Sequence, residues 1–268
     1  MILDFHTHCF PDALAPRAIE VLTKNCAAFG LLPNTDGTAS GARRLLSHAG
    51  IDGAVVCNIA TNEKQEANVN SFAIAMQQEK DFFHPLGSLH PDSQRKKAEL
   101  DRLAAAGIRG IKIHPDYVKI PINDPRFDEI FSLLEERGMF VVAHTGLDPI
   151  SPEFVHATPK MLAEIIRRHP RLTLIAAHMG GYTLSREVLD TLVGTNIYLD
   201  TSLSARRVEE WDTLREILRA HDSDRILFAS DTPWSDPAAE LAFVLSSPLT
   251  EKTKEKILAG NALRLLTK

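Results

Sequence analysis

Several features that would place this chain in a specialised class of protein are missing from its sequence. Its three cysteines, at positions 9, 26 and 57, have neither the paired spacing of a disulfide framework nor that of a zinc motif. An odd number of unpaired cysteines suits a reducing compartment, so we expect a cytoplasmic protein. No apolar run approaches the length of a membrane span. The first residues also lack the charged start and the long apolar stretch of a signal peptide.

The chain also lacks an excess of positive charge and a phosphate-binding loop. Its formal net charge is −5, which argues against nucleic acid or an anionic membrane as a partner. No glycine-rich fingerprint follows the first apolar run, which disfavours an open dinucleotide-binding sheet. A chain of 268 residues, 44% of them hydrophobic, can bury a core without disulfides. We therefore expect a small-molecule substrate and no nucleic-acid or membrane partner, while a homodimer remains possible.

The chain does contain a strict alternation of short apolar runs and longer helical patterns. The predicted strands span residues 2–5, 53–60, 84–90, 108–114, 139–145, 172–178, 196–202 and 225–231. Predicted helices between and after them include 64–80, 94–107, 124–138, 158–169, 208–221 and 251–268. In the helix over 124–138, Asp124 stands at the N-cap position and Gly138 at the C-cap position. Apolar strands in such an alternation predict a parallel sheet buried on both faces.

Eight strand–helix units favour a closed (β/α)₈ TIM barrel, of the α/β class, over an open sheet. The segment 25–41 interrupts the alternation and is rich in Gly, Thr, Ser and Asn. We interpret it as an insertion in the first strand-to-helix connection, which is either a lid near the active site or a plain surface excursion. With no linker or repeat in the sequence, residues 1–268 form one predicted domain.

Polar residues that can bind metals follow the apolar bodies of several predicted strands. His6 and His8 lie two residues apart, so in a strand both project from the same face. Further histidines and aspartates end later strands: His114, His144, His178, Asp200 and Asp231. In a parallel barrel these strand ends emerge on one rim. Imidazole and carboxylate groups hold zinc, manganese or iron, so the pattern predicts a metal site.

The same residues lie in motifs that resemble the amidohydrolase superfamily, in the amidohydrolase-related branch that also holds aminocarboxymuconate-semialdehyde and resorcylate-type decarboxylases. The motifs are DFHTH, GIKIHP, VVAHTG, AAHMGG, FASDTPW and KILAGNALRLL, and they run in family order from residue 4 to residue 266. TatD-type nucleases share several of these features but carry an acidic residue on the fourth strand, where this chain has lysine. The chain's negative charge also disfavours DNA as a substrate.

The resemblance implies one divalent metal ion, zinc before manganese or iron, held by His6, His8, His144 and Asp231. His178 would lie beside the metal-bound water or the substrate carbonyl, and Asp231 would double as the proton acceptor, which makes both catalytic residues. Lys112 and His114 share a face of the fourth strand and would bind a substrate carboxylate. The alternatives are that a carboxylated Lys112 bridges two ions, with His144 and His178 on the second, or that Lys112 is only a rim lysine paired with an aspartate.

Two enzymatic functions follow from the resemblance. The first is hydrolysis of a small amide, lactone or cyclic ester by a metal-activated water. The second is metal-dependent, non-oxidative decarboxylation of a small unsaturated or aromatic acid. Decarboxylases of this branch usually have longer chains with a larger insertion, which favours hydrolysis here. A barrel with a purely structural metal is disfavoured, because such metals have four protein ligands in a closed site.

Overall fold

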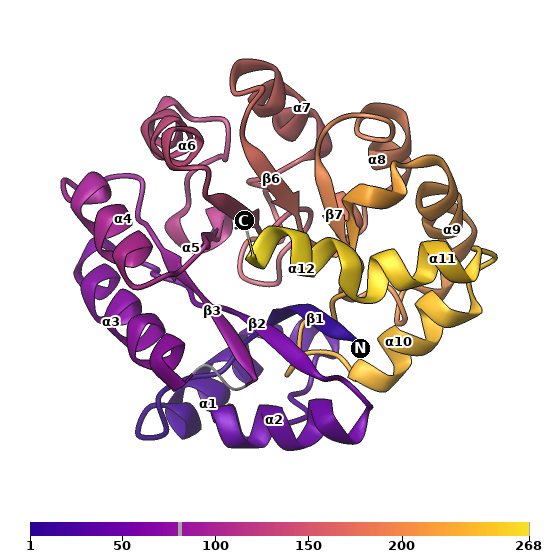
Figure 1. The fold of residues 1–268 in the computed structure, drawn as a ribbon, viewed down its shortest axis with the longest axis horizontal. Coiled ribbons are helices and arrows are strands. Elements are labelled where there is room, and N and C mark those ends of the chain that lie inside the picture. Colours follow the sequence, from indigo (N-terminus) through magenta and orange to yellow (C-terminus); the bar gives the residue numbers. More distant parts are fainter. Residues whose placement is uncertain (80–81, 268) are drawn as a thin grey trace.

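The structure, a computed structural model, describes residues 1–79 and 82–267. At its centre lie eight parallel strands in the order β1 to β8 (Figure 1). They span Leu3–Thr7 (β1), Gly53–Cys57 (β2), Phe83–Ser88 (β3), Gly110–Ile113 (β4), Phe140–Ala143 (β5), Thr173–Ala176 (β6), Tyr198–Asp200 (β7) and Ile226–Leu227 (β8). The amide of Phe5 donates to the carbonyl of Phe228 and Thr7 pairs with Thr232, so the ends of the sheet meet. The predicted (β/α)₈ TIM barrel is confirmed.

Helices pack around the strands, and most of them form an outer ring (Figure 1). They are α1 (Ala15–Cys26), α2 (Ala39–His48), α3 (Glu63–Glu79), α4 (Lys96–Ala105), α5 (Pro115–Val118), α6 (Pro125–Arg137), α7 (Pro159–Arg168), α8 (Ser185–Thr191), α9 (Trp211–Ala220), α10 (Pro237–Ser246), α11 (Glu251–Glu255) and α12 (Asn261–Leu266). The caps predicted for α6 are present: the Asp124 side chain accepts from the amide of Arg126, and Gly138 is left-handed. None of the described helices is long and apolar enough to cross a membrane.

The helix predicted over 251–268 is divided. A π-helical turn, Lys256–Gly260, separates α11 from α12. Ala259, Ala262 and Leu265 pack against residues of the barrel interior, including Leu3 and Leu227. Figure 1 shows α12 lying across the middle of the barrel at this end. The closing segment therefore seals one end of the barrel; its residue 268, like residue 80 of the helix predicted over 64–80, lies outside the described residues.

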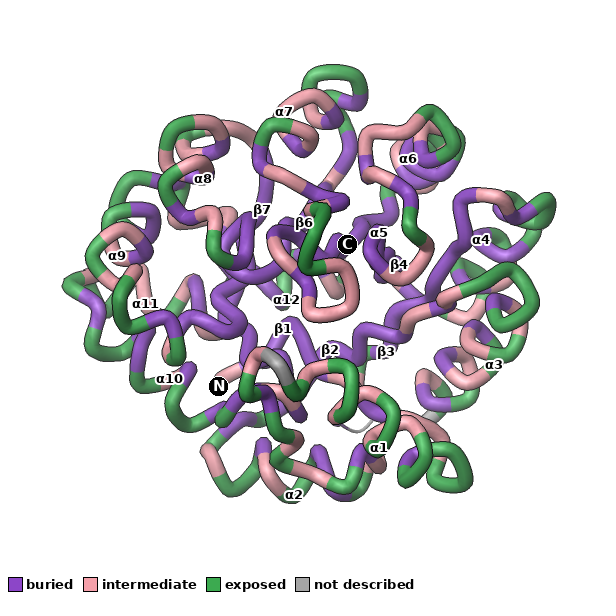
Figure 2. Tube along the Cα trace, turned by 180° about the vertical axis from the view of Figure 1, so that it is seen from behind, coloured by how far each residue is buried: buried purple, intermediate pink, exposed green. Residues whose placement is uncertain are grey.

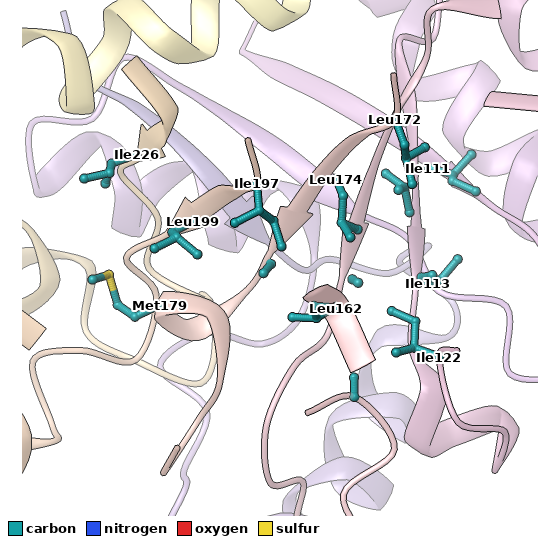
Figure 3. Close-up of a cluster of buried hydrophobic side chains, with 14 of the residues drawn as sticks. Ile111, Ile113, Ile122, Leu162, Leu172, Leu174, Met179, Ile197, Leu199 and Ile226 are labelled. Atoms are coloured by element: carbon teal, nitrogen blue, oxygen red, sulfur yellow. The ribbon is translucent and has the colours of Figure 1, made fainter. Parts of the chain in front are cut away.

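Consecutive strand residues are buried on opposite faces of the sheet, as expected for a barrel surrounded by helices. In β5, Val142 belongs to the cluster inside the barrel, and Val141 to the cluster between strands and helices. Figure 3 shows part of this outer cluster, in which Ile111 and Ile113 of β4 and Leu174 of β6 are labelled. Because both faces are buried, the strands position their carboxyl-terminal residues rigidly.

The first strand-to-helix connection contains an additional helix. α1 lies between β1 and α2, the first helix of the outer ring, and both helices are visible from the other end of the barrel in Figure 2. The connection runs from residue 8 to residue 38, so it contains most of the segment predicted as an insertion, about residues 25–41, while residues 39–41 belong to α2. α1 was not among the predicted helices, and its apolar positions line a cavity that is described below.

Candidate metal centre

His6 lies in β1 and His8 directly after it. One ring nitrogen of each histidine is held by a hydrogen-bond acceptor. Nδ1 of His6 lies 2.9 Å from a carboxylate oxygen of Asp200. Nδ1 of His8 lies 2.9 Å from the carbonyl oxygen of Cys57. Because both acceptors require a donated proton, each neutral ring carries hydrogen on Nδ1 and a free lone pair on Nε2. Orienting partners of this kind are typical of histidines that bind metals.

Both Nε2 atoms point at one carboxylate oxygen. Oδ1 of Asp231 lies 3.1 Å from Nε2 of His8 and 3.4 Å from Nε2 of His6. Ligand atoms about 2.0–2.1 Å from a tetrahedral zinc ion lie about 3.3–3.4 Å from each other, so these separations fit the edges of such a site. Two lone pairs and an anion converge, and a cation between them would offset their mutual repulsion. The donor set thus fits a divalent metal ion with three protein ligands.

Asp231 follows β8 in an unusual backbone conformation. Its φ is +70°, in the left-handed region that aspartate tolerates better than most residues. Its amide donates to the carbonyl of His6, which ties the two candidate ligands together through the backbone. Burial raises the pKa of the Asp231 carboxyl above its usual value.

Lys112 of β4 is fully buried beside these ligands. Its Nζ lies 2.9 Å from Nε2 of His6 and donates a proton to that lone pair. Burial lowers the pKa of the Lys112 ammonium group. Lys112 therefore competes with a cation for Nε2 of His6. Its hydrogen-bond partner is this candidate metal ligand and not an aspartate, as the rim-lysine alternative would have it.

A hydrogen-bonded chain fixes the orientation of His178. The carboxylate of Asp200 accepts from the backbone amide of His178 and from the Ser202 hydroxyl. Nδ1 of His178 lies 2.7 Å from Oγ of Ser202, and since the hydroxyl proton goes to Asp200, Nδ1 is the donor. Nε2 of His178 then accepts from Nδ1 of His144, 3.1 Å away. Asp200 thus orients both His6 and His178.

His144 lies in a second, neighbouring group. Its Nε2 is 3.4 Å from Oδ2 of Asp148, and Nε2 of His114 is also 3.4 Å from that oxygen. The rings of His114 and His144 stack with their centroids 4.2 Å apart. Burial lowers the pKa of His144 to about 4 and raises that of Asp148 to about 7. The structure therefore places the predicted fourth ligand with His114, and binding to the first group would require its ring to turn.

Sequence patterns did not single out Asp148, nor Asp116, which follows His114. Oδ1 of Asp116 accepts from Nδ1 of His156, and its Oδ2 is buried without a hydrogen-bond partner, 3.9 Å from Nε2 of His144. Both aspartates belong to segments that follow strands ending in histidine, and this position was the available signal. Asp200 was noted at a strand end, but its role as an orienting residue was not.

A cavity of about 460 Å³ opens beside the two groups. His6, His8, Lys112, His144, His178 and Asp231 all line it. Tyr117, Tyr182 and Trp234 contribute aromatic surface to its wall. The volume lies in the range of small-molecule sites, and the predicted site residues converge on it. The site can therefore admit a small organic molecule directly beside the ligand set.

Comparison with known proteins agrees with this geometry. The model of the amidohydrolase family matches residues 4–268, almost the whole chain. This chain belongs to the amidohydrolase family. The resemblance inferred from the sequence motifs is thereby confirmed. No curated protein matches the sequence.

Solved structures show how widely this amidohydrolase fold is used. An uncharacterised TIM-barrel protein of Bordetella bronchiseptica is 20% identical with a TM-score of 0.77, covering 99% of this chain and 98% of its own. A 5-carboxyvanillate decarboxylase of Novosphingobium aromaticivorans, complexed with manganese and a nitrobenzoic acid, is 17% identical with a TM-score of 0.73, covering 100% and 96%. A probable 2-pyrone-4,6-dicarboxylic acid hydrolase of Acinetobacter baumannii, with citric acid bound, is 15% identical with a TM-score of 0.71, covering 100% and 99%. At these identities the likeness establishes the fold.

Proposed function

We propose that this amidohydrolase is a metal-dependent hydrolase that cleaves a small ester, lactone or amide. The observation that carries the proposal is the convergence of His6, His8 and Asp231 beside an open cavity. Catalytic metal sites combine three protein ligands with a position for water or substrate, whereas structural sites are closed by four. We take zinc as the metal, with manganese or iron as alternatives, and His144 as a fourth ligand if its ring turns.

A divalent cation at this site supplies Lewis acidity and lowers the pKa of bound water to about 7. The residues of the chain supply the remaining functions. Asp231 directs one oxygen at the two histidines, which leaves its second oxygen to accept a proton from water. His178 lines the cavity and is held by Ser202 and Asp200. Its Nε2 accepts from Nδ1 of His144 in this arrangement, so it would donate to a substrate carbonyl oxygen only after gaining a proton and after the His144 ring turns. A donor held in this way would favour the developing charge of the transition state.

The engagement of Lys112 favours hydrolysis over decarboxylation. Its ammonium group already contacts His6, so no lysine or arginine among the described lining residues is free to pair with a second anion. A neutral carbonyl compound needs no such partner, whereas the substrate of a decarboxylase brings a carboxylate. Decarboxylation is the second candidate, because Lys112, His114 and a cation together could hold such a group, and a manganese-containing decarboxylase shares the fold.

Two assays on protein loaded with zinc or manganese distinguish the candidates. Hydrolysis of neutral lactones, esters and amides is measured by the amount of carboxylic acid product formed. Decarboxylation of aromatic and unsaturated acids is measured by carbon dioxide release. We expect acid release that Asp231→Asn abolishes and Asp190→Asn, at an exposed position of α8, leaves unchanged. Carbon dioxide release without hydrolysis would replace the first candidate by the second. Hydrolysis that survives Asp231→Asn would contradict the proposed site.

A further inference from the structure

The additional helix α1 presents an apolar stripe to the cavity and not to the protein core. Leu14, at its N-cap, and Ala18, Leu22 and Cys26 recur every four residues, so they share one side of the helix, and all four line the cavity. Within α1 only Ala15 is buried. A surface helix normally buries its apolar face against the core. The unburied stripe of α1 is therefore available to a ligand.

The side of α3 that lines the cavity carries no charged side chain among its described residues. Gln65, Asn68, Val69 and Phe72 line the cavity from one face of this helix, and Ile59 precedes it. Leu31 and Leu147 add further apolar surface from loops. Two amides are the polar groups of the α3 wall, and they can hydrogen-bond a neutral substituent.

Charged side chains are confined to the strand ends and the segment just after β5. Among the described residues that line the cavity, the aspartates are Asp148 and Asp231, the one ammonium group is Lys112, and no arginine is present. Lys112 is engaged with His6. The arginine and lysine of α1, Arg17 and Lys24, are exposed and do not line the cavity, and Lys24 pairs with Glu20. A carboxylate bound between α1 and α3 would thus give up part of its hydration without meeting a cation.

This distribution of apolar and charged side chains determines which chemical groups the non-reacting part of the substrate can carry. Burying one aromatic ring or a short alkyl chain strengthens binding in proportion to the apolar surface removed from water. Placing an unpaired carboxylate in the same position weakens binding, because the charge gives up hydration and gains no partner. We propose that the substrate is a neutral compound whose aryl or alkyl body lies under the α1 stripe, with its reacting group at the strand ends. The assignment of the reacting group rests on the proposed function; that of the apolar body does not.

The test compares two pairs of ligands that differ by one carboxylate. The first pair, phenylbutyryl hydroxamic acid and its para-carboxy derivative, carries a metal-binding group. The second pair, phenylbutyramide and its para-carboxy derivative, does not. Affinities are measured by titration calorimetry on the full chain after its metal content has been determined. We expect the neutral member of each pair to bind at least about tenfold more tightly.

Three variants of α1 test whether the apolar stripe causes the preference for the neutral ligand. Leu22→Arg places a cation on the cavity side of α1 and should reduce the preference to about threefold or less, or reverse it. Val21→Arg adds the same charge at an exposed position outside the cavity lining and should leave the preference unchanged. Leu22→Ala, which adds no charge, should weaken binding of the neutral members alone. Thermal unfolding of each variant establishes that it is folded.

The outcomes separate the two proposals. Equal or tighter binding of the carboxylated members by the wild-type protein would overturn the apolar substrate body. The same result for Leu22→Arg and Val21→Arg would overturn the role of α1. A protein that takes up no metal but retains the preference within the amide pair would defeat the proposed hydrolase and support the substrate class.

Discussion

Nε2 of His8 lies 3.1 Å from Oδ1 of Asp231, although 223 residues separate the two along the chain. Their meeting closes the barrel as well as the site, since the amide of His8 donates to the carbonyl of Thr232. The first and last strands are therefore joined at the point where the ligands converge. Any change that separates β1 from β8 should weaken metal binding and barrel closure together.

Removing a ligand should remove the metal without unfolding the barrel. We expect His6→Ala and Asp231→Asn to bind little metal after dialysis, because two of the three convergent donors cannot complete the site. Elemental analysis by mass spectrometry measures the metal, and circular dichroism measures the fold. Full occupancy in both variants would refute the ligand assignment.

Weakening Asp200, the residue that orients His6, should lower metal affinity less than removing a candidate ligand does. Asp200 accepts from Nδ1 of His6 and from the amide of His178. Asp200→Asn removes its charge, and we expect metal affinity to fall by about 10- to 100-fold. Competition with a chelator of known affinity measures this change, and Asp190→Asn serves as the exposed control. An unchanged affinity would mean that His6 needs no carboxylate to hold its ring.

Lys112 should oppose metal binding. Its ammonium group occupies the lone pair of His6 that a cation needs, and both charges would be buried together. We expect Lys112→Met to tighten binding of a single metal ion by about tenfold. Metal stoichiometry provides the check on the bridged alternative: if the wild type holds two ions and Lys112→Met holds fewer, then Lys112 is carboxylated and bridges them.

A buried carboxyl outside the candidate ligand set should make stability depend on pH. Burial raises the pKa of Glu240 from 4.5 to about 8, while its oxygens accept from Ser235 and Ala205. The folded state therefore keeps a proton that the unfolded state loses above about pH 4.5. This contribution is complete below that pH and disappears as the pH rises through about 8.

We expect Glu240→Gln to remove that slope. Urea unfolding at about pH 5 and about pH 8 should show the wild type losing up to a few kcal/mol more than the variant. Glu153→Gln, at an exposed position, should follow the wild type. Parallel curves for all three proteins would show that Glu240 titrates normally.

Gly146 should tolerate no side chain. Its φ is +90°, and a Cβ atom there would lie 2.0 Å from the backbone nitrogen of Tyr182, to which this loop is bridged. We expect Gly146→Ala to lower the free energy of unfolding by about 3 kcal/mol or more. Gly138→Ala, which is also left-handed but has open space around it, should cost about 1 kcal/mol. Equal losses in urea unfolding would contradict the close approach.

Sequence reasoning predicted the barrel because its evidence is local. The caps of α6, Asp124 and Gly138, lie at the two ends of one apolar pattern, and each predicted strand is a short apolar run. The helix α1 was not among the predicted helices, although Leu14, Ala18 and Leu22 recur at helical spacing in the sequence. The break in the closing helix at Lys256–Gly260 depends on how Ala259 packs against the barrel, which no local pattern encodes.

For this protein, the sequence alone determined the alternation of strands and helices and the rim on which His6, His8, His178 and Asp231 would meet, since alternation fixes the direction of every strand. Only the tertiary structure decided which partner each side chain has. It gave Asp200 to His6 and His178, placed His144 beside Asp148, and laid α1 over the cavity. The physical reason is that hydrogen bonds and ring orientations depend on ångström distances between segments far apart in the chain, which strand periodicity does not specify.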